Sequence, residues 1–290
     1  MERNEVGAMK LNDIRIRDPF ILPHEGMYYL YGTRSAECWG KAEGFDCYYS
    51  RDLEDWEGPV EIFRRQPDFP LDENYWAPEC YAIDGRFYLL TTFGGEQVKK
   101  GVYALVSNSP LGPFVLHSGR LTPEDWTCID GSLFRKGSHN YLLFSHSFED
   151  GVLEGDMCCV ELSADLKERI SEPEVLFSAS EVPWPKPFPW AREEFGIEGD
   201  CYFTDGPFVL EGENGALHLY WSSWCTNGYA VGEAVSESGK IAGPWKHLDR
   251  LIFPENGGHG MAFRRMDGRL LYTLHYPNDK YREHPIFIEI

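Results

Sequence analysis

The sequence predicts an all-β protein: a five-bladed β-propeller whose four-stranded antiparallel blades surround a central axis. Three observations support this fold class. A short motif occurs five times, an aromatic-rich apolar run follows each copy after a polar turn, and helical periodicity is almost absent. A repeat of about 40–50 residues or more, built from strand, turn and strand, is typical of one propeller blade.

The five copies of the motif give the expected innermost strand of each blade. They read Asp18-Pro-Phe-Ile-Leu, Ala77-Pro-Glu-Cys-Tyr, Asp130-Gly-Ser-Leu-Phe, Asp205-Gly-Pro-Phe-Val and Gly258-His-Gly-Met-Ala-Phe. Three copies open on an aspartate, which we interpret as the same register. Equivalent positions of a radial repeat converge on the axis, so Asp18, Asp130 and Asp205 are predicted to face one another.

The remaining strands follow in order within each blade. Runs such as Met27–Tyr31 supply the second strand, and Gly101–Ser107 is typical of a third strand. Gly-Pro-aromatic turns lead into outer strands, because proline cannot pair within a central strand. A closed ring joins its first and last blades, so we expect one end of the chain to supply a strand to the blade at the other end.

The long step between the third and fourth copies contains Ser178–Asp200, in which prolines alternate with tryptophan and phenylalanine. This segment is either a surface connection packed by its own aromatic side chains or a lid that lines one side of the axial pocket. It includes Ala191–Phe195, the best candidate for a helix in the chain.

Composition limits the classes of partner. The repeats run from end to end, so residues 1–290 are expected to form a single catalytic domain. The net charge of −20 disfavours nucleic acid and anionic membrane as partners. The first six residues lack the apolar core of a signal peptide, which favours a cytoplasmic location and reduced cysteines. Oligomeric state stays open.

Carboxyl groups that meet at one cavity can hydrolyse a glycosidic bond. One ionised carboxylate draws a proton from water while a protonated one donates to the leaving oxygen from the opposite face of the sugar. A third carboxylate can raise the pKa of the acid by like-charge repulsion. Asp-Gly and Asp-Pro are also ordinary turn dipeptides, but three of them in register within a repeat favour the site.

The motifs resemble those of glycoside hydrolase family 43, five-bladed propeller enzymes that act on α-L-arabinofuranosides and β-D-xylosides. The matching segments are Arg17–Ile21, Tyr28–Thr33, Trp76–Glu79, Ile129–Ser132, Asp205–Phe208, Gly257–Met261 and Leu274–His275. They extend from Arg17 to His275, so the resemblance covers nearly the whole chain.

The resemblance implies that Asp18 is the general base and that Asp130 tunes the pKa of the acid and orients it. The family acid is usually a glutamate in Glu-Gly-Pro, whereas this chain has Asp205-Gly-Pro, which is one methylene shorter. Either the backbone or the substrate shifts to compensate, or Glu79, Glu198 or Asp200 is the acid.

The resemblance also implies that His259 lies in the central channel, where a family calcium ion is often found. No cofactor is expected to be required, and a calcium ion near His259 is a family inference. Sugar contacts are expected from Trp76 as a stacking platform with Phe93 behind it. Further contacts are expected from Glu79, His146 and His275.

The prediction is therefore an inverting glycosidase that cleaves arabinofuranosyl or xylosyl linkages in small plant-type oligosaccharides. Three alternatives stay open: a carbohydrate-binding propeller without catalysis, a protein-interaction propeller and, more distantly, a retaining fructan-type glycosidase. The last shares Arg17-Asp18-Pro19 and Glu79-Cys80 but spreads its motifs over separate blades.

Overall fold

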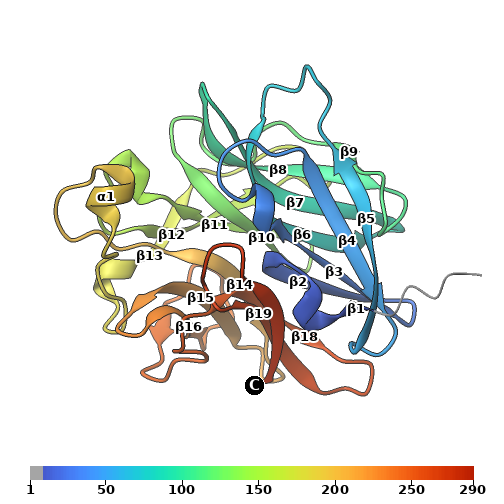
Figure 1. Cartoon of the computed structure of the whole chain (residues 1–290). Helices are drawn as coiled ribbons and strands as arrows, with labels where there is room; N and C mark the ends of the chain where they lie inside the picture. The colour runs from blue at the N-terminus through green and yellow to red at the C-terminus, as the bar shows by residue number, and fades with distance from the viewer. Residues whose placement is uncertain (1–8) are drawn as a thin grey trace, which may run out of the picture.

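A computed structural model describes residues 9–290 and confirms the five-bladed β-propeller (Figure 1). Each of its five antiparallel sheets consists of strands that follow one another in the chain. The innermost strands β2, β6, β10, β14 and β18 contact one another in that order, and β18 contacts β2. The ring therefore closes around a central axis.

The sheets contain the following strands. Blade one contains β1 (Met9–Lys10), β2 (Ile16–His24), β3 (Met27–Arg34), β4 (Gly44–Ser50) and β5 (Asp55–Arg64). Blade two contains β6 (Glu73–Ile83), β7 (Arg86–Gly95), β8 (Val98–Ser107) and β9 (Val115–Leu116). Blade three contains β10 (Cys128–Lys136), β11 (His139–His146), β12 (Asp156–Leu162) and β13 (Glu174–Ser178). Blade four contains β14 (Asp205–Glu211), β15 (Leu217–Cys225), β16 (Gly228–Ser236) and β17 (Lys246–His247). Blade five contains β18 (Gly258–Arg264), β19 (Leu270–Tyr276) and β20 (His284–Glu289).

Blades two, three and four have the predicted four strands, whereas blade one has five and blade five has three. The helices of the described residues are short. They are α1 (Ala191–Phe195) and the 3-10 turns η1 (Leu11–Asp13), η2 (Ser35–Glu37), η3 (Phe148–Asp150) and η4 (Ala179–Glu181). The helix α1 confirms the single helical candidate, and no helix of residues 9–290 could cross a membrane. The expected lack of a signal peptide concerns residues outside the described range, and the single-domain assignment stays a prediction.

The predicted exchange of a strand between the two ends of the chain is wrong for the described residues. Strand β1 pairs with β5 inside its own blade, and β20 pairs with β19. Side chains join blades one and five instead. The rings of Tyr28 and Phe263 pack with centroids 6.4 Å apart, and the Tyr28 hydroxyl accepts a hydrogen bond from the Met266 amide. One apolar core includes residues of both blades, so burial holds the ring closed without a shared strand.

Aromatic side chains fill the space between blades one and two. The ring of Phe93 lies 4.5 Å from that of Tyr75 and 5.9 Å from that of Phe45, and all three side chains are buried. Such pairs each stabilise the fold by about 0.5–1.5 kcal/mol beyond the area they bury. The aromatic-rich runs of the sequence therefore serve the core as well as the pocket.

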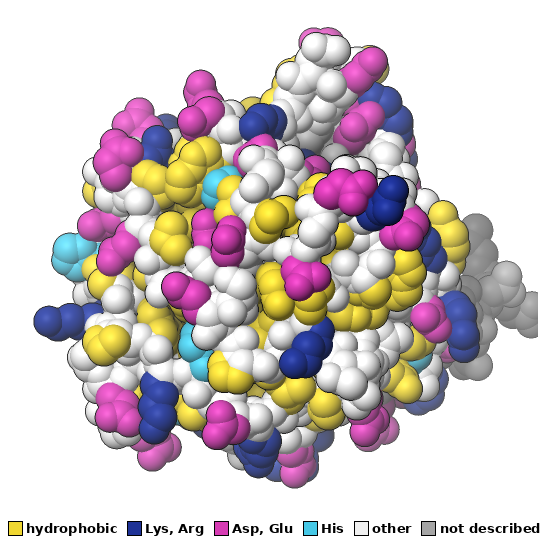
Figure 2. Space-filling view, turned by 90° about the vertical axis from the view of Figure 1, so that its left-hand side faces the viewer, with side chains coloured by type: hydrophobic (Ala, Val, Ile, Leu, Met, Phe, Trp, Pro, Cys, Tyr) yellow, Lys and Arg dark blue, Asp and Glu magenta, His cyan; other side chains and the backbone are white. Residues whose placement is uncertain are grey.

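Figure 2 shows the side of the molecule on which α1 lies in Figure 1. Acidic side chains are spread over this face, with basic side chains between them and hydrophobic ones exposed in several places. This distribution agrees with the net charge of −20.

Candidate active site

All five innermost strands carry a bulge of the same kind close to their start. In each blade the ladder between the first and second strand skips one residue here, and the bulged residue has a positive φ between 46° and 60°; blade two has a second register shift, between Glu73 and Trp76. The bulged residues are Asp18, Ala77, Asp130, Gly206 and His259. A bulge re-aims the side chain it carries, and here it directs Asp18, Asp130 and His259 to the axis.

The bulges show that the three aspartates do not share one register, which corrects the sequence interpretation. Asp18 and Asp130 are bulged residues, but in blade four the bulged residue is Gly206 and Asp205 precedes it. Asp205 is thus equivalent to Arg17, Trp76 and Ile129, and all four line the same pocket. The side chains of the three aspartates nevertheless converge on His259.

The amide of each bulged residue donates a hydrogen bond to a side chain of the preceding blade. The acceptors are His275 Nδ1 for Asp18, Thr33 Oγ1 for Ala77, Thr92 Oγ1 for Asp130, Asp130 Oδ2 for Gly206 and Ser222 Oγ for His259, at 2.8–3.2 Å. These bonds satisfy donors that the bulge removes from the ladder, since buried amides require partners. They also fix the position of each blade relative to its neighbour around the axis.

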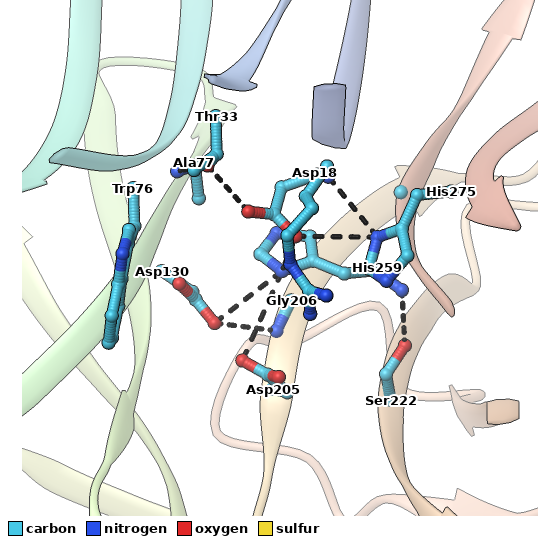
Figure 3. Close-up of polar contacts among 12 residues, drawn as sticks. Asp18, Thr33, Trp76, Ala77, Asp130, Asp205, Gly206, Ser222, His259 and His275 are labelled. Atoms are coloured by element: carbon cyan, nitrogen blue, oxygen red, sulfur yellow. Dashed lines mark hydrogen bonds and ion pairs between the residues drawn. The ribbon is translucent and has the colours of Figure 1, made fainter. Parts of the chain in front are cut away.

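The three carboxylates meet at His259 (Figure 3). Its Nδ1 lies 3.3 Å from Asp18 Oδ1, 3.6 Å from Asp130 Oδ2 and 4.0 Å from Asp205 Oδ1. The Asp18 and Asp130 side chains are 9% and 4% exposed, whereas that of Asp205 is 22% exposed. The first two are therefore buried around His259, whereas Asp205 lines the pocket beside them.

The environment separates the protonation states of Asp18 and Asp130. Burial alone would raise the pKa of Asp18, but His259 and Arg17 outweigh it and hold that pKa well below its ordinary value. Burial and the charges of Asp205 and Asp18 raise the pKa of Asp130 well above its ordinary value. At neutral pH Asp18 is therefore an ionised carboxylate, whereas Asp130 binds its proton more tightly than an ordinary aspartate does.

The guanidinium group of Arg17 is a positive charge that acts on the Asp18 carboxylate. Its Nη1 donates to Glu283 Oε1 at 2.8 Å and to Asn278 Oδ1 at 2.9 Å. Glu283 is buried and its other oxygen accepts from Ser35. Burial opposes the charge of Arg17, yet Asp18 and Glu283 raise its pKa further above the ordinary value, so it stays charged. This cluster joins blade one to the β19–β20 connection at the pocket.

A pocket of about 340 Å³ has Asp205 in its lining. Tryptophans stand on both sides of it: Trp39 and Trp76 come from blades one and two, while Trp190 and Trp224 come from the α1 segment and blade four. Trp39 and Trp190 are 46% and 45% exposed. Flat aromatic faces beside a polar floor suit the apolar faces and hydroxyl groups of a sugar.

The Ser178–Asp200 segment contributes Phe188, Trp190, Glu194 and Phe195 to this pocket. Phe188 also packs against Phe148 and Phe203 in a small apolar cluster. The segment therefore lines the pocket and is packed by its own aromatic side chains, so both alternatives for it describe part of its structure.

Several residues expected at the site lie elsewhere. Phe93 is fully buried in the aromatic core rather than behind a sugar. His146 stacks on Trp126 with ring centres 4.2 Å apart and contacts Asp150, and it does not line the pocket. Its neighbours Ser147 and Phe148 do, so His146 supports the turn that carries them.

Glu79 also lies away from the pocket. It is buried on β6, where it accepts a hydrogen bond from the Tyr81 hydroxyl. Burial raises the pKa of Glu79 to about 8, so it is protonated at neutral pH. Glu198 and Asp200 are exposed and outside the pocket, and Glu198 pairs with Arg192. These three carboxyl groups are therefore poorly placed to replace Asp205 as the acid.

His275 is buried behind Asp18 rather than exposed to a ligand. Its Nδ1 accepts the amide of Asp18 at 3.2 Å, and its Nε2 lies 3.3 Å from Asn278 Oδ1. An acceptor Nδ1 places the ring proton on Nε2. Burial lowers the pKa of His275, which agrees with a neutral ring that orients Asp18.

Several pocket residues were missed because they lie outside the repeated motif. Trp39, Phe148 and Asn278 belong to connections between second and third strands. Since the second strand runs antiparallel to the first, those connections end beside the motif starts. That rule of topology could have identified them from the sequence.

The group that could hold a metal ion consists of Asp130, Asp205 and His259, whose donor atoms lie within 4.8 Å of one another. Calcium takes about six to eight oxygen ligands, and this group supplies two carboxylates and a nitrogen. Water would have to supply most of the ligands of a calcium ion here, so the water-coordinated calcium beside His259 stays a prediction and no step is assigned to it.

Comparisons with known proteins agree with this geometry. The family model of Glycosyl hydrolases family 43 matches residues 12–286. No curated protein matches the chain. Among solved structures, an endo-arabinase from Bacteroides thetaiotaomicron VPI-5482 is 36% identical with a TM-score of 0.87, over 98% of this chain and 96% of that one.

Two less similar structures share the fold. An endo-1,4-beta-xylanase from the same organism is 23% identical over 98% of this chain and 92% of the other, with a TM-score of 0.73. An alpha-L-arabinofuranosidase from Lactobacillus brevis is 20% identical over 94% and 90%, with a TM-score of 0.72. The family match, the 36% identity and the converging carboxylates lead to one conclusion: the chain belongs to glycosyl hydrolases family 43.

Proposed function

We propose that this chain is an inverting glycoside hydrolase that cleaves α-L-arabinofuranosyl or β-D-xylosyl linkages in small plant-type oligosaccharides. The observation that carries the proposal is the convergence of Asp18, Asp130 and Asp205 on His259 below an aromatic-walled pocket. Family membership supports hydrolysis of a glycosidic bond. The 36% identity to a structure described as an endo-arabinase favours the arabinofuranosyl linkage over the xylosyl one.

In the proposed mechanism, the sugar ring at the scissile bond lies between Asp18 and Asp205. Ionised Asp18, held by Thr33 through a 2.6 Å hydrogen bond, accepts a proton from the attacking water. Asp205 donates its proton to the leaving oxygen as the bond from the anomeric carbon breaks. Products are a free sugar and an alcohol, and Asp18 and Asp205 then exchange protons with solvent.

Asp130 has a supporting role in this mechanism. Its Oδ2 accepts the amide of Gly206, the residue after Asp205, at 3.2 Å. It therefore fixes the backbone that carries the acid, Asp205. The reaction needs only carboxyl groups and water, so the proposal includes no cofactor.

A screen of aryl α-L-arabinofuranosides and β-D-xylosides tests the proposal, with Asp18→Asn as the inactive variant. Asparagine tolerates the positive φ of 52° at this position, so the fold is expected to persist. Turnover should fall by about 10²–10⁴-fold. Asp249→Asn, at an exposed position, is the matched control.

Near-normal turnover by Asp18→Asn would exclude Asp18 as the base. The carbohydrate-binding alternative predicts instead that the unchanged protein hydrolyses none of these compounds and that sugar affinity survives in Asp18→Asn. Calorimetric titration with arabino-oligosaccharides and xylo-oligosaccharides distinguishes the two outcomes.

A further inference from the structure

The acid position is where this chain departs from the Glu-Gly-Pro pattern that it otherwise resembles. The shorter Asp205 has fewer rotatable bonds, so its carboxyl group stays close to the backbone of β14. Gly206 follows it with a φ of 47°, and a Cβ there would lie 2.6 Å from the His259 ring. The backbone is thus held against His259 and cannot move toward the substrate without displacing that ring.

Tyr229 reaches this carboxyl group from β16, the third strand of blade four. Its hydroxyl donates to Asp205 Oδ2 at 2.6 Å, and its side chain lines the pocket although it is 2% exposed. The ring is held on both sides. It stacks on Phe203 at 6.1 Å and on His275 at 5.5 Å.

Gly258 completes the support of this ring. A Cβ at Gly258 would lie 2.6 Å from Tyr229 Cε1, so the ring lies directly on the backbone at the start of β18. A tyrosine that is stacked and packed in this way keeps its hydroxyl oxygen in one place.

We propose that Tyr229 positions the proton of the acid in this chain, by engaging Asp205 Oδ2 so that Oδ1 carries the proton to be transferred. The inference rests on the proposed function. Tyr229 acts through Asp205 and is a positioning residue, because no bond to the substrate is assigned to it.

The consequence for the reaction follows from the two oxygens of Asp205. Oδ2 accepts the hydrogen bond of the Tyr229 hydroxyl, so the proposal assigns the acidic proton to Oδ1, which lies 4.0 Å from His259 Nδ1. When the glycosidic bond breaks, that proton moves to the leaving oxygen and the bond electrons go with the oxygen. Asp205 is left as a carboxylate whose Oδ2 keeps the hydrogen bond of Tyr229.

The test compares Tyr229→Phe with the unchanged protein on aryl α-L-arabinofuranosides of different leaving groups. Dinitrophenolate departs without protonation, whereas unsubstituted phenolate and a sugar alcohol need the acid. In Tyr229→Phe, kcat is expected to fall by roughly tenfold to a hundredfold on the phenyl glycoside and by less than about threefold on the dinitrophenyl glycoside. The expected loss is below the ~10²–10⁴-fold effect of general acid catalysis as a whole.

Tyr272→Phe is the matched control, because it removes another buried tyrosine hydroxyl, one that donates to the Gly260 carbonyl. It should lower both rates equally or not at all. Equal losses on both leaving groups in Tyr229→Phe, or no loss on either, would overturn the positioning role while leaving the hydrolase function intact. If the unchanged protein cleaves no glycoside, the proposed function fails and the inference fails with it.

Discussion

Replacing Glu79 with glutamine should make the stability of the protein less dependent on pH. Glu79 is buried on β6, contacts Tyr81 and Ser132, and has a pKa raised by burial from 4.5 to about 8. A carboxyl group of raised pKa binds its proton more tightly in the folded chain than in the unfolded chain. The unfolded chain therefore binds fewer protons between pH 4.5 and 8, and the free energy of unfolding falls as pH rises through that window.

The size of the effect follows from the shift itself. Each pH unit inside the window lowers the free energy of unfolding by about 1.4 kcal/mol, which amounts to about 5 kcal/mol over the whole window. Glutamine has the same shape and cannot ionise, and its amide can keep the contact with Tyr81. The variant and the unchanged protein should be similarly stable near pH 5, and the variant should be several kcal/mol more stable near pH 8.

Urea unfolding from pH 5 to 9 measures this difference, with constant m values as the check on two-state behaviour. The control is Glu54→Gln, which removes a carboxylate from an exposed position and should leave the pH dependence unchanged. Parallel stability curves for Glu79→Gln and the unchanged protein would show that Glu79 is ionised in the folded state, and the reasoning from burial would be refuted.

Two further predictions concern the pocket wall and its support. Glu283→Gln should lower the free energy of unfolding by about 3 kcal/mol, since it removes one partner of a buried ion pair and leaves Arg17 with Asp18 as its remaining negative neighbour. Urea unfolding checks this against Glu43→Gln, which removes a partly exposed pair and is expected to cost at most about 1 kcal/mol. Equal losses in the two variants would contradict the prediction. Trp76→Ala should raise KM with little loss of stability, whereas Phe93→Ala should lower the free energy of unfolding by about 3–5 kcal/mol and leave KM unchanged. Steady-state kinetics and thermal unfolding of both variants separate the two effects. The reverse pattern would place the sugar contact at Phe93.

The repeat made the fold predictable, because five copies of strand, turn and strand leave few other architectures. What the sequence did not reveal was the bulge that shifts each ladder by one residue. Aligning the motifs without the bulge made Asp205 look equivalent to Asp18, although Gly206 is the bulged residue of blade four. Positive φ at a non-glycine residue such as Asp18 depends on the amide acceptor from the preceding blade, His275, which no local pattern encodes.

Site residues were predictable where a side chain suited to catalysis occupies an equivalent position of the repeat. They were not predictable where burial determines whether an aromatic side chain lies in the pocket or in the core. Asp18, Asp130 and His259 meet because equivalent residues of a ring face its axis. Phe93 and Tyr75 look alike as aromatic residues near a motif, and only the packing between blades one and two shows that both belong to the core. Ring closure by side chains at Arg17 likewise depends on tertiary contacts rather than on strand patterns.

The configuration of the first sugar released tests the central claim most directly. Direct displacement by water activated at Asp18, with Asp205 protonating the leaving oxygen, inverts the anomeric carbon. Proton NMR of the hydrolysis of an α-L-arabinofuranoside should therefore show the β anomer first, with the α anomer growing in only by mutarotation. If the α anomer forms first, the reaction proceeds by double displacement through an enzyme-bound sugar, and the roles assigned to Asp18 and Asp205 are contradicted.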